Sequence, residues 1–146
     1  MRPYTAVICT LLAGPALAEC ATDDTYFYCP TQGGTTPVRL CTTDPLNAEL
    51  TIGRQTVAID LASMRPTLPS DGPESYRAID FHDPLSGQAF RVWATGLPVG
   101  FPEMNGGFEI TEGKSVVDSA RCDPDGPVMD RLTELFVLID DAQVSP

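Results

Sequence analysis

Apolar and polar residues alternate along much of the chain, in short segments separated by glycine and proline. Two segments show this alternation most clearly, with apolar residues at Val57, Ile59 and Leu61 and at Phe90, Val92 and Ala94. Every second side chain of a strand points to the same face, so both segments predict strands with one buried face. The 12 glycines and 14 prolines lie between such segments, which is typical of an all-β domain.

The alternating segments predict eight strands in four hairpins. The strands are expected at 25–29, 37–41, 48–52, 55–61, 76–82, 87–94, 106–111 and 114–121, and the hairpin turns at 32–34, 53–54, 83–86 and 112–113. Segments 66–75 and 97–105 contain prolines and are expected to be loops between hairpins. The predicted fold is a small antiparallel barrel, or a strongly curved sheet, of about eight strands.

The period of the pattern changes after Cys122. Apolar residues now recur at spacings of three and four, at Val128, Met129, Leu132, Leu135, Phe136 and Ile139. This spacing predicts a C-terminal helix over 127–142 that packs against the sheet or closes one end of the barrel. Asp125 would cap it and Pro127 would occupy its first turn. The run 135–139 also fits a buried strand, which is the alternative.

The first eighteen residues have the pattern of a secretory signal peptide. Arg2 supplies the positive charge, an apolar stretch follows, and Ala16-Leu17-Ala18 has the small residues that signal peptidase requires. We therefore expect cleavage after Ala18, which leaves one domain of residues 19–146 in the bacterial periplasm or exterior. Leu17-Ala18-Glu19-Cys20 resembles a lipoprotein box, but the charged Glu19 stands where that box needs a small residue. We expect no membrane insertion after cleavage.

The net charge of the chain limits the kinds of molecule that it can bind. Removal of the signal peptide reduces Lys and Arg from 9 to 8 against 20 Asp and Glu, a formal net charge of −12. Such a surface repels nucleic acid and anionic lipid, and it would attract a basic protein. The sequence also has no glycine-rich phosphate loop and no basic stripe, so neither a nucleotide nor a nucleic acid is expected as ligand.

Four cysteines remain in the mature chain, and an even number in an oxidising compartment predicts two disulfides. No two of them are closer than nine residues, so no zinc site or other cofactor is expected. If the first hairpin turns between Gly33 and Gly34, Cys29 faces inward and Cys41 faces outward, so these two cannot readily pair. The predicted disulfides are Cys20–Cys41 and Cys29–Cys122.

Catalytic groups are few. His82 is the only histidine, and it has Asp80, Asp83 and Ser86 close by in sequence. A Ser-His-Asp set needs a nucleophile elbow and an oxyanion hole, and no G-x-S-x-G motif is present. His82 is therefore interpreted as a surface residue at the end of a strand. An envelope hydrolase that uses His82 with Ser86, or a pair of carboxylates, is the alternative function.

Two further patterns of acidic residues could indicate a calcium site or a pair of catalytic carboxylates. Asp123-Pro124-Asp125-Gly126 looks like part of a calcium loop, but Arg121 and Leu132 would stand where that loop needs carboxylates. Helix capping is the preferred interpretation of this segment. The carboxylates Asp60, Asp80 and Asp118 could pair as a glycosidase acid and base, although their spacing singles out no pair. The sequence therefore predicts neither a metal site nor a catalytic residue.

The cysteine and hairpin layout resembles that of small uncharacterised exported proteins of Gram-negative bacteria. It consists of Tyr26-Phe27-Tyr28-Cys29, Val38-Arg39-Leu40-Cys41, Leu50-Thr51-Ile52-Gly53, Gly107-Phe108-Glu109-Ile110, Gly113-Lys114 and Arg121-Cys122. It covers most of the mature chain. Because it depends on placement rather than on a motif, the resemblance implies the fold and the compartment but no activity.

A second segment is similar to the inhibitory loop of the periplasmic and membrane-bound inhibitors of c-type lysozyme, which are small disulfide-bonded β-barrels. That loop carries Ser-Gly-x-x-Tyr, and Ser86-Gly87-Gln88-Ala89-Phe90 differs from it by phenylalanine for tyrosine. Thr95 stands where the family has a lysine. The resemblance implies binding residues Ser86, Gly87 and Phe90, and a basic envelope or lysozyme-like protein as partner. The expected function is a non-catalytic periplasmic binding module.

Overall fold

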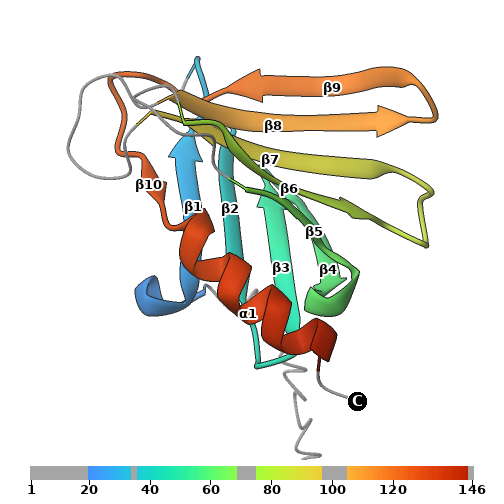
Figure 1. Cartoon of the computed structure of the whole chain (residues 1–146). Helices are drawn as coiled ribbons and strands as arrows, with labels where there is room; N and C mark the ends of the chain where they lie inside the picture. Colours follow the sequence, from blue (N-terminus) through green and yellow to red (C-terminus); the bar gives the residue numbers. More distant parts are fainter. Residues whose placement is uncertain (1–19, 34–35, 69–74, 97–104, 145–146) are drawn as a thin grey trace, which may run out of the picture.

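The structure is a computed structural model that describes residues 20–33, 36–68, 75–96 and 105–144. The predicted signal peptide 1–18 and its cleavage site after Ala18 lie outside the described residues. Within the described part of the chain the fold is mostly β, with ten strands and one C-terminal helix (Figure 1).

Eight of these strands are the predicted ones. Their bounds are β1 Thr25–Pro30, β2 Pro37–Thr42, β3 Asn47–Ile52, β4 Gln55–Asp60, β6 Arg77–His82, β7 Ala89–Thr95, β8 Asn105–Glu112 and β9 Ser115–Arg121. The four predicted hairpins are confirmed, because β1 pairs with β2, β3 with β4, β6 with β7 and β8 with β9, all antiparallel. Local alternation between turns was therefore a sufficient signal for these elements.

The strands form two sheets and not a closed barrel, so that part of the prediction was wrong. The first sheet has the order β10-β1-β2-β3-β4 and the second has the order β5-β6-β7-β8-β9. In Figure 1 the strands of the first sheet run steeply across those of the second. The chain leaves the first sheet after β4 through a short 3-10 helix, η2 (Leu61–Ser63), and then starts a new sheet at β5.

The two additional strands explain why the count is ten rather than eight. β5 (Arg65–Thr67) lies where a loop was predicted and pairs with β6. Pro66 is tolerated there because β5 is an edge strand, in which one side needs no ladder donor. β10 (Met129–Asp130) lies where the helix was predicted to begin, and it completes the other side of β1.

The C-terminal helix α1 (Leu132–Val144) begins five residues later than the predicted start at 127. Residues Met129 and Asp130 pair with β1 instead, and the Asp130 carboxylate accepts a hydrogen bond from Leu132 N at 3.1 Å. Asp130 rather than Asp125 thus supplies the side-chain oxygen that binds the first N–H of the helix. The run 135–139 is helical, so the strand alternative was wrong. No helix among the described residues is long and apolar enough to cross a membrane.

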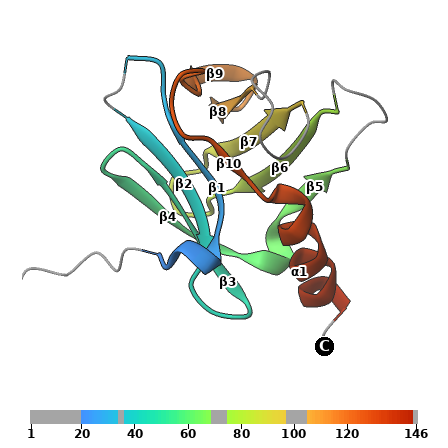
Figure 2. The same ribbon diagram turned by 90° about the vertical axis from the view of Figure 1, so that its left-hand side faces the viewer.

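One hydrophobic core lies between the two sheets and under α1. It contains side chains from both sheets and the helix, among them Phe27, Leu40, Leu50, Ile79, Phe90, Val92, Phe108, Leu132, Leu135 and Ile139. The helix packs against η2, β1 and β6, and so covers one side of the space between the sheets (Figure 2). The outer faces of the two sheets are left to carry the polar residues of each strand.

Both predicted disulfides are present. Cys20 bonds to Cys41 and Cys29 bonds to Cys122, with Cα–Cα distances of 6.2 and 5.5 Å. The predicted register of the first hairpin is also observed, because Cys29 lies opposite Val38 and Phe27 lies opposite Leu40. Cys29–Cys122 joins the two sheets at the point where Thr31 and Cys122 form an isolated bridge.

Candidate functional site

Ser86 and Gly87 lie in the turn that ends the β6–β7 hairpin, and both are exposed. This hairpin end projects away from the helix in Figure 1. The Asp83 carboxylate organises the turn, since it accepts hydrogen bonds from Leu85 N (3.0 Å), Ser86 N (3.1 Å) and the Ser86 hydroxyl (2.6 Å). Gly87 has a φ of +75°, which only glycine adopts readily. The hairpin tip is thus held by its own contacts.

Phe90, the third residue of the predicted binding set, is in the core. Its side chain is 1% exposed, and its ring stacks on Phe81 at 5.1 Å between centroids. The structure therefore separates Phe90 from Ser86 and Gly87: the aromatic ring supports the hairpin from inside, and only the turn faces solvent.

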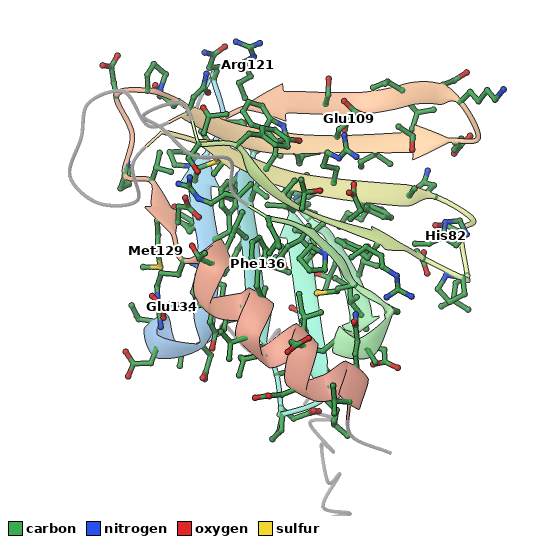
Figure 3. All side chains as sticks on the ribbon, in the orientation of Figure 1. His82, Glu109, Arg121, Met129, Glu134 and Phe136 are labelled. Atoms are coloured by element: carbon green, nitrogen blue, oxygen red, sulfur yellow. A yellow bond between two sulfur atoms is a disulfide. The ribbon has the colours of Figure 1, made fainter. Side chains whose placement is uncertain are left out.

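His82 is the last residue of β6 and is exposed, as the sequence predicted (Figure 3). The nearby Ser86 hydroxyl donates to Asp83 and not to His82. The three candidate carboxylates lie on different strands: Asp60 on β4, Asp80 on β6 and Asp118 on β9. Asp60 accepts from Ala62 N at 2.9 Å, and Asp80 is bound to Arg91, so two of the three already have local partners.

The segment 123–126 forms a turn and does not cap a helix, which corrects the preferred interpretation of the sequence. Asp125 N donates to Asp123 Oδ1 at 3.0 Å, and Gly126 N donates to the Asp123 carbonyl at 3.1 Å. Within the described residues, no group of three or more His, Cys, Asp and Glu side chains is arranged to hold a metal ion.

The outer face of the second sheet carries a denser set of polar and aromatic groups. Strand register places four residues in one row across it, namely Asp80, Arg91, Glu109 and Ser119. The adjacent row consists of Ala78, Trp93, Gly107 and Arg121. Side chains on one face of neighbouring strands contact each other across the ladder, so the two rows form one continuous surface.

Arg91 and Asp80 form an ion pair on this surface. Arg91 Nε lies 2.6 Å from Asp80 Oδ1, and Arg91 Nη2 lies 3.2 Å from Oδ2. The hydrogen bond that Arg91 donates to the Asp80 carboxylate is the main cause that raises the pKa of Arg91 above its ordinary value, and the charges of Asp80 and Glu109 add to it. The guanidinium is therefore fixed in place while its side chain stays 45% exposed.

Two aromatic rings lie beside this ion pair. Tyr76, just before β6, stacks on Trp93 with 6.4 Å between ring centroids and 21° between ring planes. At that distance near-parallel rings are offset, so part of each face stays uncovered. Gly107 leaves space for the indole, because an added Cβ would lie 3.1 Å from Trp93 Cζ2 and would collide with the Ala120 carbonyl oxygen. We call these two rings the aromatic shelf.

The aromatic shelf and the charged residues beside it line an open pocket of about 640 Å³, here termed the outer pocket. Arg91, Glu109, Ser119 and Arg121 line it together with the two rings, and Gln32 also belongs to the lining. Gln32 is held there because its backbone N–H donates to the Arg121 carbonyl at 3.0 Å. Within the described residues, the side chains of Glu109 and Arg121, labelled in Figure 3, make no hydrogen bond, although the charge of Glu109 acts on Arg91.

A second hollow, of about 520 Å³, lies between the β2–β3 connection and α1. Its acidic lining consists of Asp24, Asp44 and Asp141. The Asp44 carboxylate is occupied by its own turn, since it accepts from the Asn47 side chain and from Leu46 N. The bond from the Asn47 side chain is the main reason why the pKa of Asp44 is lowered. This hollow has no aromatic residue in its lining, unlike the outer pocket.

Comparison of the chain with protein-family models, with curated proteins and with solved structures found no match. The assignment of a site therefore depends on the geometry of the chain itself.

The sequence interpretation did not identify the outer pocket, although one signal for it was present. The alternation that places Phe90, Val92 and Ala94 on the buried face also places Arg91 and Trp93 together on the other face. Glu109 and Arg121 join them only through the pairing of β7 with β8 and β8 with β9. The first half of the site could thus be found from the sequence, and the second half required the strand order.

Proposed function

We propose that the exported chain is a non-catalytic binding module of the bacterial periplasm or exterior, and that the outer pocket is its ligand site. The presence of two disulfides supports an oxidising compartment. The observation that carries the assignment of the site is the outer pocket itself. There an aromatic shelf lies within one cavity with Glu109 and Arg121, whose side chains make no hydrogen bond to another described residue.

Ligand sites combine apolar or aromatic surface with a small number of fixed polar groups. The aromatic shelf supplies the aromatic surface, and Arg91, which is fixed by Asp80, supplies a fixed polar group. Trp93 and Arg91 both lie on β7, which is held by ladders on both sides because it lies between β6 and β8. A rigid sheet keeps the pocket preformed, which lowers the entropic cost of binding.

Binding is favoured over hydrolysis because the groups that hydrolysis would need already have other contacts. The Ser86 hydroxyl donates to Asp83, and Asp80 is bound to Arg91. The Ser86 hydroxyl is therefore not placed to act as a nucleophile with His82, and the Asp80 carboxylate is not placed to act as a base.

A test uses the protein exported to the periplasm and immobilised, with soluble envelope material passed over it. N-terminal sequencing of the purified protein checks its export and should give Glu19 as the first residue, because the signal peptide is expected to be cleaved after Ala18. We expect a retained compound that is recovered chemically unchanged and is lost from a Trp93→Ala variant. The matched variant Tyr28→Ala, on the outer face of the first sheet, should retain it. Equal retention by all three proteins would show that the outer pocket is not the site, and cleavage of the retained compound would show an enzyme.

A second candidate function is inhibition of a lysozyme-like enzyme by the hairpin tip. The observation in its favour is that Ser86 and Gly87 are exposed at the projecting end of β6–β7. A protruding turn of this kind can enter an enzyme cleft, and the negative surface of this chain would attract a basic enzyme.

A further inference from the structure

We infer that the outer pocket takes a neutral oligosaccharide, with one sugar ring on the aromatic shelf and its hydroxyl groups on Glu109 and Arg121. This inference rests on the proposed function and names the ligand class for the same site.

The charges around the outer pocket cancel. Arg91 and Arg121 are opposed by Asp80 and Glu109, and Arg91 is already neutralised by its contact with Asp80. An anionic ligand would meet Glu109 and the surrounding net charge of the chain, whereas a cationic ligand would meet Arg121. A ligand without charge avoids both penalties, because it can accept from the guanidinium and donate to the carboxylate.

The shelf fits the less polar face of a sugar ring. Aromatic faces carry negative charge density, which attracts the weakly positive C–H groups on one side of a pyranose. Tyr76 and Trp93 are stacked with only 21° between their ring planes, so the two rings hold each other in a fixed orientation beside the polar groups. Gly107 keeps the floor below the indole free of a side chain.

The polar groups of the outer pocket fit pairs of hydroxyl groups. A guanidinium donates two parallel hydrogen bonds, and a carboxylate accepts two. Glu109 and Arg121 therefore match adjacent hydroxyls of a sugar, one by accepting and the other by donating. Ser119 and Gln32, which also line the pocket, can each donate and accept. An apolar ligand would leave all four groups unpaired.

Trp93 makes a direct test possible because it is the only tryptophan in the chain. Its emission reports on the aromatic shelf alone. Hexasaccharides of glucose, N-acetylglucosamine, mannose and galactose are titrated into the exported protein, and heats of binding are measured in parallel. We expect at least one of them to change the emission and to bind with a measurable Kd.

Variants locate the binding site. Arg121→Gln and Glu109→Gln should each raise the Kd of that sugar about tenfold or more, because each loses hydrogen bonds to a charged group. The matched controls are Arg54→Gln, in the exposed β3–β4 turn, and Asp118→Asn, exposed on β9 outside the pocket. Both should leave the Kd within about twofold, as expected for residues without contact to the ligand. Equal effects of pocket and control variants would overturn the inference.

Two further probes separate the ligand class from the function. Polygalacturonate represents an acidic glycan, and an extended polar decapeptide represents a protein segment that would add to the free edge of β9. If polygalacturonate alone changes the Trp93 emission, the neutral-sugar inference is wrong while binding at the outer pocket stands. If the decapeptide alone changes it, both the ligand class and the site are wrong, because the peptide would pair with the edge of β9. If no hexasaccharide responds at millimolar concentration, the inference is overturned, and the retention experiment with envelope material decides the proposed function separately.

Discussion

Arg77 and Asp130 form a buried ion pair that joins the second sheet to the start of α1. Arg77 is 2% exposed, and both its Nε, at 2.6 Å, and its Nη2 donate to Asp130 Oδ2. Arg77 Nη1 donates to the carbonyls of Ser75 (3.0 Å) and Gly96 (2.8 Å). The other oxygen of Asp130 caps Leu132 N. One contact thus fixes β6, β10 and the helix start together.

Removal of one partner should leave an unpaired buried charge. We expect Asp130→Asn, which keeps an oxygen for the helix cap, to lower the free energy of unfolding by about 3–5 kcal/mol. Urea denaturation followed by circular dichroism measures it. The control is Asp80→Asn in the exposed Arg91 pair, where the expected loss is below about 1 kcal/mol. Similar losses from both variants would contradict a special role of the buried pair.

The two disulfides should contribute unequally to stability. Cys29–Cys122 spans 93 residues and Cys20–Cys41 spans 21. Because a longer closed loop restricts the unfolded chain more, we expect a loss of roughly 4–5 kcal/mol for Cys29→Ala with Cys122→Ala and roughly 3 kcal/mol for Cys20→Ala with Cys41→Ala. Denaturation of both double variants measures the difference. Peptide mapping without reductant that recovered a Cys29–Cys41 peptide would refute the pairing.

Gly107 is required for the floor of the outer pocket. In Gly107→Ala the added methyl group would collide with the Ala120 carbonyl, so β9 must move away from β8. We expect a loss of about 1–3 kcal/mol, as for other overpacked sites, with a shift of Trp93 emission. Ser119→Ala, a neighbour on the same face, is the control. It should change neither the free energy of unfolding nor the Trp93 emission by a comparable amount. Thermal unfolding and fluorescence of the two variants provide the test.

The hairpin tip should depend on pH through Asp83. The Ser86 hydroxyl, followed by Leu85 N, lowers the pKa of Asp83 below its ordinary value. A lowered folded-state pKa means that ionised Asp83 stabilises the turn above the unfolded pKa, near 4, and that this contribution is lost as pH falls through the folded pKa. Carbon NMR of the carboxyl should show that Ser86→Ala raises the pKa of Asp83. Asp44 is the internal control, because its own partner Asn47 is unchanged.

Lysozyme inhibition provides a test of the tip itself. If the second candidate function is correct, the exported protein inhibits a c-type lysozyme, and Ser86→Ala with Gly87→Asp abolishes inhibition without unfolding the chain. Gly87 has a positive φ, so near-ultraviolet circular dichroism of the variant must match the natural protein. Lack of inhibition by the natural protein at large excess over the enzyme would exclude this function.

The amino-acid sequence determined eight of the ten strands, the presence of the C-terminal helix and the two disulfides. Each hairpin depends on alternation within one strand and on residues in one turn, and both are visible in a short window. The register Phe27–Leu40 followed from the first turn, and it decided which face each cysteine occupies. The apolar spacing at Leu132, Leu135 and Ile139 likewise identified the helix.

Only the tertiary structure decided how these elements meet. The helix start at Leu132 depends on Asp130, whose partner Arg77 is 53 residues away. Division into two sheets depends on which edges pair, and strand alternation is the same in a barrel and in a sandwich. The outer pocket combines Trp93 with Arg121 from a strand two positions across the sheet. Such contacts arise from the packing of distant segments, so no local pattern along the chain encodes them.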